Sequence, residues 1–308
     1  MMLYREMSHD FIVKSDAKNS QEVRELAIGH IKKGLPSKPE LWDVLTPSYP
    51  PGCRRILASD DYYPALGREN VKLDTRNIQR ITETGIQTAD GETTDFDLIV
   101  YATGFRTVEF LHPIKVYGGG GRDLAEIWDG GATAYYGVTV EEMPNFGLLY
   151  GPNTNLGHNS IILMIEAQSR YLAALIDPVI RAKEAGVSLA IQPKTEIVRA
   201  FNADIQKRLA NSNFADPACN SWYKTADGRI TNNWPGTVVE YQQALSRVRW
   251  TDYVVDDETM KFVGKKETRI GHVEEVWPVS KSTLLLGLSV AVAAGGWYLQ
   301  GARASRRR

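Results

Sequence analysis

Two adjacent arginines, Arg54 and Arg55, are the first candidates for chemistry in this sequence. They follow a rigid stretch that contains Pro50 and Pro51, and they lead into a short apolar segment. A guanidinium group is always charged and binds phosphate or carboxylate in a forked geometry, so this pair could hold a phosphate or stabilise a developing anion. A solvated basic pair without a function is the competing interpretation, because the spacing alone does not separate the two.

A second candidate lies at the end of a predicted strand. Residues Phe96 to Ala102 form an apolar run of strand length, which predicts a strand buried on both faces, and Thr103 and Gly104 follow as a turn. Because Gly104 has no Cβ, its backbone could approach a dinucleotide closely. An ordinary exit from a strand into a loop is the alternative.

A third candidate is the glycine-rich turn from Tyr150 to Ser160, which precedes a predicted helix over Ser160 to Lys183. The N-terminus of a helix presents free N–H groups and the positive end of the helix dipole. Such a site suits an anion, or a cofactor edge that becomes anionic, such as the pyrimidine side of a reduced flavin. Simple capping by Asn159 or Ser160 is the alternative, and His158 alone is more often structural than catalytic.

The two cysteines, Cys53 and Cys219, stand far apart and cannot make a disulfide scaffold. They fit a reducing compartment, and we interpret both as isolated structural residues. No zinc-ligand spacing is present, so no metal site is expected. The aromatic residues of Cys219 to Tyr223 and of Trp234 to Gly236 could line a cleft or serve only in packing.

Short strands and amphipathic helices must position these residues. Three short segments with β-compatible composition, Val71 to Leu73, Ile78 to Thr82 and Gly85 to Thr88, with a turn at Ala89 to Gly91, predict a small antiparallel meander. Apolar periodicity predicts helices over Ser20 to Lys33 and Thr195 to Leu209. The residues expected on the apolar face of one or the other helix are Val23, Leu26, Ala27, Ile31, Val198, Phe201, Ile205 and Leu209.

The segment Ser282 to Gln300 is 19 residues long and contains no charged side chain. A helix of about this length crosses the hydrocarbon of a bilayer, and Trp297 and Tyr298 would lie near one interface. The sequence therefore predicts a C-terminal transmembrane helix followed by a basic tail over 301–308, with the body facing the cytosol. The membrane could be the endoplasmic reticulum, the mitochondrial outer membrane or the peroxisome, and a buried C-terminal helix is the alternative.

Composition bounds the function class. The chain has 308 residues, of which 43% are hydrophobic and 24% charged, so it is not a disordered chain. A formal net charge of −1 gives no overall basic field, and we expect no nucleic-acid partner.

Taken in order, the motifs resemble the class B flavoprotein monooxygenases, specifically the Baeyer–Villiger type. The resemblance covers about residues 20–240. The stretches that carry it are Leu45 to Leu57, Asp61 to Leu66, Asp97 to Phe105, Gly151 to Ser160, Cys219 to Tyr223, and Asn232 to Gly236.

The resemblance implies cofactors and residue roles. Enzymes of this family use FAD and NADPH, and insert one oxygen of O2 into a ketone through a peroxyflavin. Arg55 would be the catalytic arginine, because a permanent cation stabilises an anion that must persist until substrate arrives. Arg54 would bind the 2′-phosphate of NADPH. The remaining cofactor-binding residues that the resemblance implies are Thr103, Gly104, Gly157, His158, Asn159, Ser160 and Trp222.

The sequence departs from the family in lacking both G-x-G-x-x-G loops, which hold the phosphates of the two cofactors. We therefore expect an α/β fold that is a partial two-dinucleotide-binding-domain flavoprotein fold plus a C-terminal transmembrane helix. The expected divisions are 1–56 from the helical insertion of the NADPH domain, 57–245 from the C-terminal part of the FAD domain, 246–281 as a linker, then 282–300 and 301–308.

Three functions stay open at this point. The chain could be a ketone-oxygenating monooxygenase, with a separate N-terminal polypeptide supplying the missing loops. It could be a catalytically inactive, tail-anchored remnant or interaction protein. It could also use the same flavin chemistry to oxygenate nitrogen or sulfur.

Overall fold

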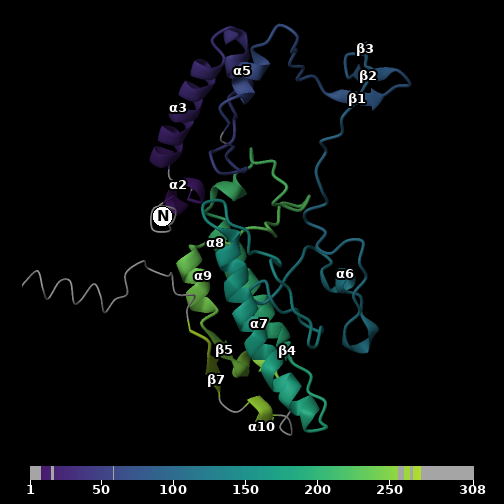
Figure 1. Ribbon diagram of the computed structural model, residues 1–308, viewed down its shortest axis with the longest axis vertical. Coiled ribbons are helices and arrows are strands. Elements are labelled where there is room, and N and C mark those ends of the chain that lie inside the picture. The colour runs from purple at the N-terminus through teal and green to yellow at the C-terminus, as the bar shows by residue number, and fades with distance from the viewer. Residues whose placement is uncertain (1–7, 15–16, 58, 256–259, 264–265, 272–308) are drawn as a thin grey trace, which may run out of the picture. The chain divides into compact units, whose positions relative to one another are not determined.

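The computed structural model of the chain describes residues 8–14, 17–57, 59–255, 260–263 and 266–271 (Figure 1). The chain divides into the units Met1–Gly271 and His272–Arg308, and the second lies outside the described residues. The short helices of the first unit are α2 (His9–Ile12), α4 (Trp42–Leu45), α5 (Tyr62–Leu66), α6 (Leu124–Ile127) and α10 (Met260–Val263), with 3-10 turns at Pro39–Leu41, Gly119–Gly121, Asn213–Ala215 and Trp250–Asp252.

The core is built on two long helices, α7 (Ile161–Glu184) and α8 (Thr195–Leu209). Both begin and end within one residue of the predicted limits, so periodicity predicted them correctly. Val198, Ile205 and Leu209 are buried, which confirms the predicted apolar face of α8. The helix α9 (Val238–Ala244) packs against α7.

The N-terminal helix α3 (Ala17–Gly34) is also confirmed, but its predicted apolar face is only partly covered. Ile31 is 2% exposed, whereas Leu26 is 75% exposed. Tyr63 of α5 and Trp42 of α4 lie at His30 and Lys32, beside Ile31. Leu26 lies on the predicted apolar face but is not covered, because periodicity shows which face is apolar and not what covers it.

The predicted meander is confirmed in part as the antiparallel sheet of β1 (Ile78–Ile81), β2 (Gly85–Thr88) and β3 (Thr93–Asp95) (Figure 1). The predicted segment Val71 to Leu73 is not a strand, and β3, which was not predicted, supplies the third strand. The turn between β2 and β3 falls at the predicted position. The guanidinium of Arg76 pairs with three carboxylates around this turn, those of Asp74, Asp90 and Glu92.

The strand predicted over residues 97–102 is absent. These residues have no regular secondary structure, and Leu98 and Val100 are each 78% exposed. A strand needs a neighbour to satisfy its backbone N–H and C=O groups. No strand among the described residues pairs with this segment, so its apolar composition alone does not make it a strand.

Four short strands accompany the helices, one between α7 and α8 and the other three after α9. β4 (Gln192–Pro193) pairs with β6 (Tyr253–Val254), and β5 (Arg247–Arg249) pairs with β7 (Glu267–Arg269), both antiparallel. Val248, Trp250 and Tyr253 are buried, so this part of the predicted linker is folded. The described residues are therefore α/β in content, and they contain no doubly wound parallel sheet.

No helix in the described part of the chain is long and apolar enough to cross a membrane. The predicted span at 282–300 and the basic tail at 301–308 lie outside the described residues. The membrane anchor thus stays a prediction.

Candidate functional site

The loop that precedes α7 forms the floor of the candidate site. Its residues 151–156 are buried, and Asn155 pairs in parallel with Asn233 from the segment before α9. The backbone N–H of Asn155 donates to Asn232 O at 2.8 Å, and the N–H of Trp234 donates to Asn155 O at 2.9 Å. The stretches around Asn155 and Asn233, which are distant in the sequence, therefore lie side by side.

Glycines let this floor pack closely. A Cβ on Gly137 would lie 2.6 Å from Pro152 O and would also meet Thr154 Cγ2. Gly137 has a φ of +68°, a backbone angle that residues other than glycine rarely adopt. The position of the 151–155 loop therefore depends on glycine at 137.

Tyr150 connects this floor to the helical core. Its backbone N–H donates to Oε1 of Gln168, a fully buried residue of α7, at 2.8 Å. Its phenol donates to Oδ1 of Asn155 at 2.8 Å. Gln168 is itself fixed, because its Nε2 donates to the hydroxyl of Tyr241 on α9 at 2.8 Å. The tyrosine is thus held at both its backbone and its ring.

The charge of Arg55 acts on Tyr150 and Tyr223. Burial raises the pKa of the Tyr223 phenol, and the positive charge of Arg55 opposes that rise. Burial likewise raises the pKa of Tyr150, again opposed by the charge of Arg55. The structure therefore brings the predicted catalytic arginine to the loop that contains the predicted flavin-facing residues.

His158 is a buried imidazole in the same loop. It is 7% exposed, and neither ring nitrogen has a hydrogen-bond partner among the described residues. Its ring meets that of His9 edge-on, with centroids 5.0 Å apart. Burial, and to a lesser extent His9, lowers the pKa of His158 to about 4, so the ring is neutral at neutral pH.

The N-terminus of α7 follows directly. Ser160 occupies the N-cap position, as expected, but its side chain makes no capping hydrogen bond. Instead, Oδ1 of Asn159 accepts the backbone N–H of Ser160 at 2.8 Å. Gly157, Asn159 and Ser160 are each half-buried. The side chain of Ser160 therefore does not cap the helix. The N-terminus of α7 remains a favourable place for an anionic group.

Arg54 contacts Tyr49 and Asn220. Its guanidinium lies 5.0 Å from the ring centroid of Tyr49, and its Nη2 donates to Asn220 O. The side chain is exposed, so it can still reach a phosphate from solvent. Both arginines are exposed, and they differ in their neighbours: the charge of Arg55 acts on the phenol of Tyr223, whereas Arg54 contacts Tyr49 and Asn220.

Trp222, Thr103 and Gly104 are all exposed. The Trp222 ring lies 4.3 Å from the Tyr223 ring, and its backbone O accepts from Oγ1 of Thr107 at 2.8 Å. The turn after Gly104 thus reaches the loop of Trp222. Around Gly104 itself a Cβ would meet nothing within 4 Å, and the φ of +82° is what requires glycine there.

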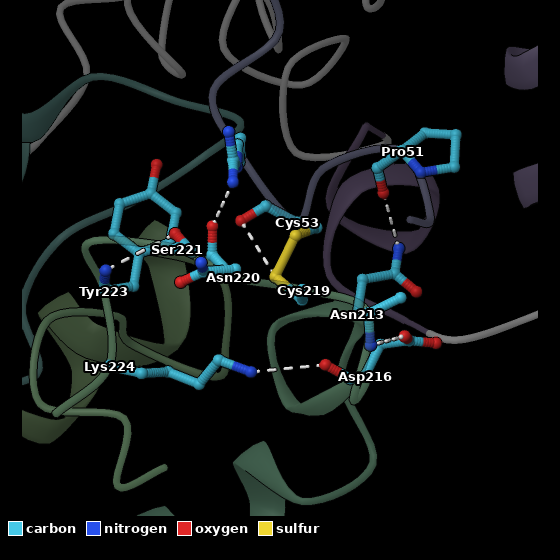
Figure 2. The surroundings of a disulfide bond; sticks show 11 residues. Pro51, Cys53, Asn213, Asp216, Cys219, Asn220, Ser221, Tyr223 and Lys224 are labelled. Carbon is cyan, nitrogen blue, oxygen red and sulfur yellow. Dashed lines mark hydrogen bonds between the residues drawn. A yellow bond between two sulfur atoms is a disulfide. The ribbon is translucent and has the colours of Figure 1, made fainter. Parts of the chain in front are cut away.

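The two cysteines form a disulfide, contrary to the expectation that they are isolated (Figure 2). Their Cα atoms are 5.6 Å apart although 166 positions separate them in the sequence. The expectation failed because spacing along the chain says nothing about contacts that folding creates. A reducing compartment can no longer be argued from these cysteines.

Residue types and spacing assigned no role to Tyr150, Tyr223 or Asn155. Tyr150 begins the glycine-rich stretch and Tyr223 ends the stretch from Cys219, but only the fold shows that the charge of Arg55 acts on both phenols. Within the described residues no group of three or more His, Cys, Asp or Glu side chains could hold a metal ion.

Comparison with known proteins identifies relatives for this site. The chain is 55% identical over 298 residues to the FAD-binding monooxygenase ktnD of Aspergillus niger, a match that covers 96% of this chain and 48% of the relative. It is 40% identical over 217 residues to a Baeyer–Villiger monooxygenase of Streptomyces coelicolor, covering 70% of this chain and 41% of that protein.

Over the stretch that it spans, the chain belongs to the FAD-binding and Baeyer–Villiger monooxygenases. It spans about half the length of these curated relatives. No family model matches the chain.

Solved monooxygenase structures show the same fold. The OTEMO complex with FAD and NADP matches with a TM-score of 0.68 at 22% identity, over 80% of this chain and 46% of that one. Oxidized steroid monooxygenase bound to NADP matches with a TM-score of 0.65 at 26% identity, over 84% and 47%. The recognition made from the sequence is thus confirmed, including the partial coverage of the family fold.

The described residues fit one part of a flavin, its ring edge. The buried ring nitrogens of His158 have no protein partner there, and the N-terminus of α7 lies next to them in the sequence. Unpartnered buried polar atoms are rare, and a polar ligand edge would satisfy them. The glycine loops that would hold the phosphates of FAD and NADPH are not in this sequence, so the fit extends to the ring and not to the whole cofactor.

Proposed function

We propose that this chain supplies the oxygenation half of an FAD- and NADPH-dependent monooxygenase that inserts one oxygen of O2 into a ketone. The observation that supports this most is that the charge of Arg55 acts on the phenols of Tyr150 and Tyr223, and that Tyr150 donates to Asn155 in the loop before α7. When bound, FAD would supply the redox and oxygen chemistry.

The chain's own residues would then position and stabilise charge. Arg55 is an exposed, permanent cation whose charge acts on the Tyr223 phenol. A cation that is already in place stabilises a developing anion without reorganising at the moment of reaction. The residues Gly157 to Ser160 would face the flavin edge, with His158 neutral and able to donate or accept one hydrogen bond.

The NADPH side would use the exposed groups. Arg54 keeps exposed N–H donors for a 2′-phosphate, and the exposed Trp222 ring could cover the nicotinamide portion. Thr103 and Gly104 would border FAD, because no side chain occupies the space beside Gly104.

The test is complementation. The chain is co-expressed with the segment of the Aspergillus niger relative that it does not span, and ketone-dependent NADPH oxidation and the ester product are measured. Arg55→Ala is expected to lower ester formation by about 100-fold or more while flavin absorbance is kept. Arg55→Lys, which keeps the charge without the fork, should recover part of that loss.

Arg54→Ala is the matched control. It should raise the KM for NADPH and leave ester formation at saturating NADPH near the parent value. Ester formation that is unchanged in Arg55→Ala would contradict the proposal. An N-oxide or a sulfoxide as the product would indicate the alternative oxygenation, and no product in any combination would indicate a non-catalytic remnant.

We also propose that residues 282–300 anchor the chain in a membrane, with the preceding residues on the cytosolic side. The support is the composition of that segment, 19 residues without a charge followed by four arginines in the last six residues.

A further inference from the structure

A cavity lies between residues 108–115 and the helix α6. Its volume is about 520 Å³, which falls within the range of roughly 300–1,000 Å³ that small-molecule sites have. None of the residues that line it is a candidate for binding FAD or NADPH or for the oxygenation chemistry. The cavity is therefore a site of its own.

The inner wall of the cavity is apolar and aromatic. Leu124, Trp128 and Ala132 are 3%, 8% and 2% exposed and belong to one hydrophobic cluster, against which Phe110 packs. The rings of Phe110 and Trp128 meet edge-on, with centroids 6.0 Å apart. The indole N–H of Trp128 is already used, because it donates to Thr133 O at 2.7 Å. This wall therefore suits an aromatic ring, which packs against ring edges and needs no hydrogen bond.

Two carboxylates also line the cavity, and both have partners. Oε2 of Glu109 lies 3.2 Å from Nη1 of Arg106 and 3.6 Å from Nδ1 of His112. Oδ1 of Asp123 accepts the backbone N–H of Ala125 at 3.0 Å, at the start of α6. These interactions leave neither carboxylate as a free counter-ion for the remaining charged residue of the lining, Lys115.

Lys115 differs from the two carboxylates, because no described residue forms a hydrogen bond or an ion pair with it. The side chain is exposed. An ammonium group donates up to three hydrogen bonds and binds a carboxylate more strongly than it binds a neutral acceptor. The lining therefore offers a cation to an anionic group whose apolar part rests on the aromatic wall.

The cavity adjoins the loop of Trp222. Thr225, which lines the cavity, stands three residues after Trp222. On the other side Val108 follows Thr107, whose Oγ1 donates to Trp222 O at 2.8 Å. A ligand in the cavity would therefore touch both segments that meet at Trp222.

We propose that this cavity binds an aromatic carboxylic acid, with its ring against Phe110 and Trp128 and its carboxylate on Lys115. A neutral ligand of the same shape would fill the apolar wall but would not neutralise the ammonium group. A cationic ligand would be repelled by it. The proposal goes beyond the function proposed above and does not depend on it.

The test uses the whole chain without cofactors and three probes that share one body, namely phenylbutyrate, phenylbutyramide and phenylbutylamine. Dissociation constants are measured by isothermal titration calorimetry. Phenylbutyrate is expected to bind about 10-fold more tightly than the amide, since a hydrogen bond between charged groups contributes more than one to a neutral acceptor. The amine is expected to bind more weakly still.

Trp128 shows where the probe binds. Its indole N–H resonance is assigned by NMR with Trp128→Phe, and saturation with phenylbutyrate should shift it. Trp250 is the reference, because its indole N–H donates to Oγ1 of Thr268 at 2.9 Å and the residue does not line the cavity. Its resonance should stay in place.

Two variants test the two ends of the ligand. Lys115→Gln should weaken phenylbutyrate binding by about 10-fold and leave binding of the amide unchanged. Ala125→Phe adds a ring at an exposed position of α6 that lines the cavity, so it should weaken binding of all three probes. Lys183→Gln removes an exposed lysine elsewhere and is the matched control.

Four outcomes would overturn the proposal. They are no binding of phenylbutyrate at millimolar concentration, equal or tighter binding of the amide or the amine, unchanged affinity for phenylbutyrate in Lys115→Gln, and a Trp128 resonance that does not move at saturation. If Ala125→Phe does not fold, Lys115→Gln still gives the result. No flavin or NADPH takes part, so a failure here leaves the complementation result standing, and a failed complementation leaves this result standing.

Discussion

Replacing the buried imidazole of His158 by an amide is expected to remove a pH-dependent part of the free energy of unfolding. Burial lowers the pKa of His158 from 6.5 to about 4 in the folded chain. In the unfolded chain the ring is solvated and titrates at its ordinary value. Between these two values the unfolded state binds a proton that the folded state does not bind.

The sign follows from this difference in bound protons. As pH falls from 6.5 to 4, protonation stabilises the unfolded state and the free energy of unfolding decreases. Above 6.5 the ring is neutral in both states, and below 4 it is charged in both, so the contribution is flat outside this window. At about 1.4 kcal/mol for each pH unit, the separation corresponds to a loss of about 3 kcal/mol.

The measurement is urea-induced unfolding of the chain at a series of pH values from 4 to 7.5, followed by tryptophan fluorescence. His158→Gln should lose about 3 kcal/mol less than the parent chain between pH 6.5 and 4. The comparison uses the change with pH, so a constant destabilisation by the substitution does not affect it.

His30→Gln is the matched control, because His30 is exposed on α3 and the chemical change is the same. Parallel curves for His158→Gln and the parent chain would refute the reasoning. A control variant that flattens the curve as much as His158→Gln would also refute it, since burial would then not be the cause.

The remaining predictions concern the floor of the site and the membrane anchor. Gly137→Ala is expected to cost about 3 kcal/mol in urea unfolding, because the new methyl group meets Thr154 and Pro152 at a positive φ. Gly186→Ala, at a φ of +73° with nothing within 4 Å, should cost only about 1 kcal/mol, and equal losses would disprove the role of the close approach. Deletion of residues 282–308 should move the chain from the membrane to the soluble fraction after cell lysis, whereas a full chain that is already soluble would contradict the anchor.

Local sequence signals predicted the helices and the meander. The apolar spacing of α8 reproduces its bounds, because helix formation depends on neighbours three and four positions apart. The paired strands were also predicted from a local signal, because the short turn between β2 and β3 fixes their register. The motifs also identified the family, because their order along the chain can be read without knowing which of them are in contact.

The sequence did not predict features that depend on distant partners. The apolar run at 97–102 does not form a strand, because a strand exists only where another backbone pairs with it. The exposure of Leu26 shows the same limit for a helix, since an apolar face needs a covering element.

What the sequence determined by itself was the residue types of the site: a permanent cation at Arg55, a glycine-rich loop before a helix, and aromatic rings near Trp222. The tertiary structure alone decided which of them meet. It brought the charge of Arg55 to act on Tyr223 and closed a disulfide across 166 positions. The physical reason is that charge and hydrogen-bonding capacity belong to single residues, whereas contact between residues far apart in the chain is created only by folding.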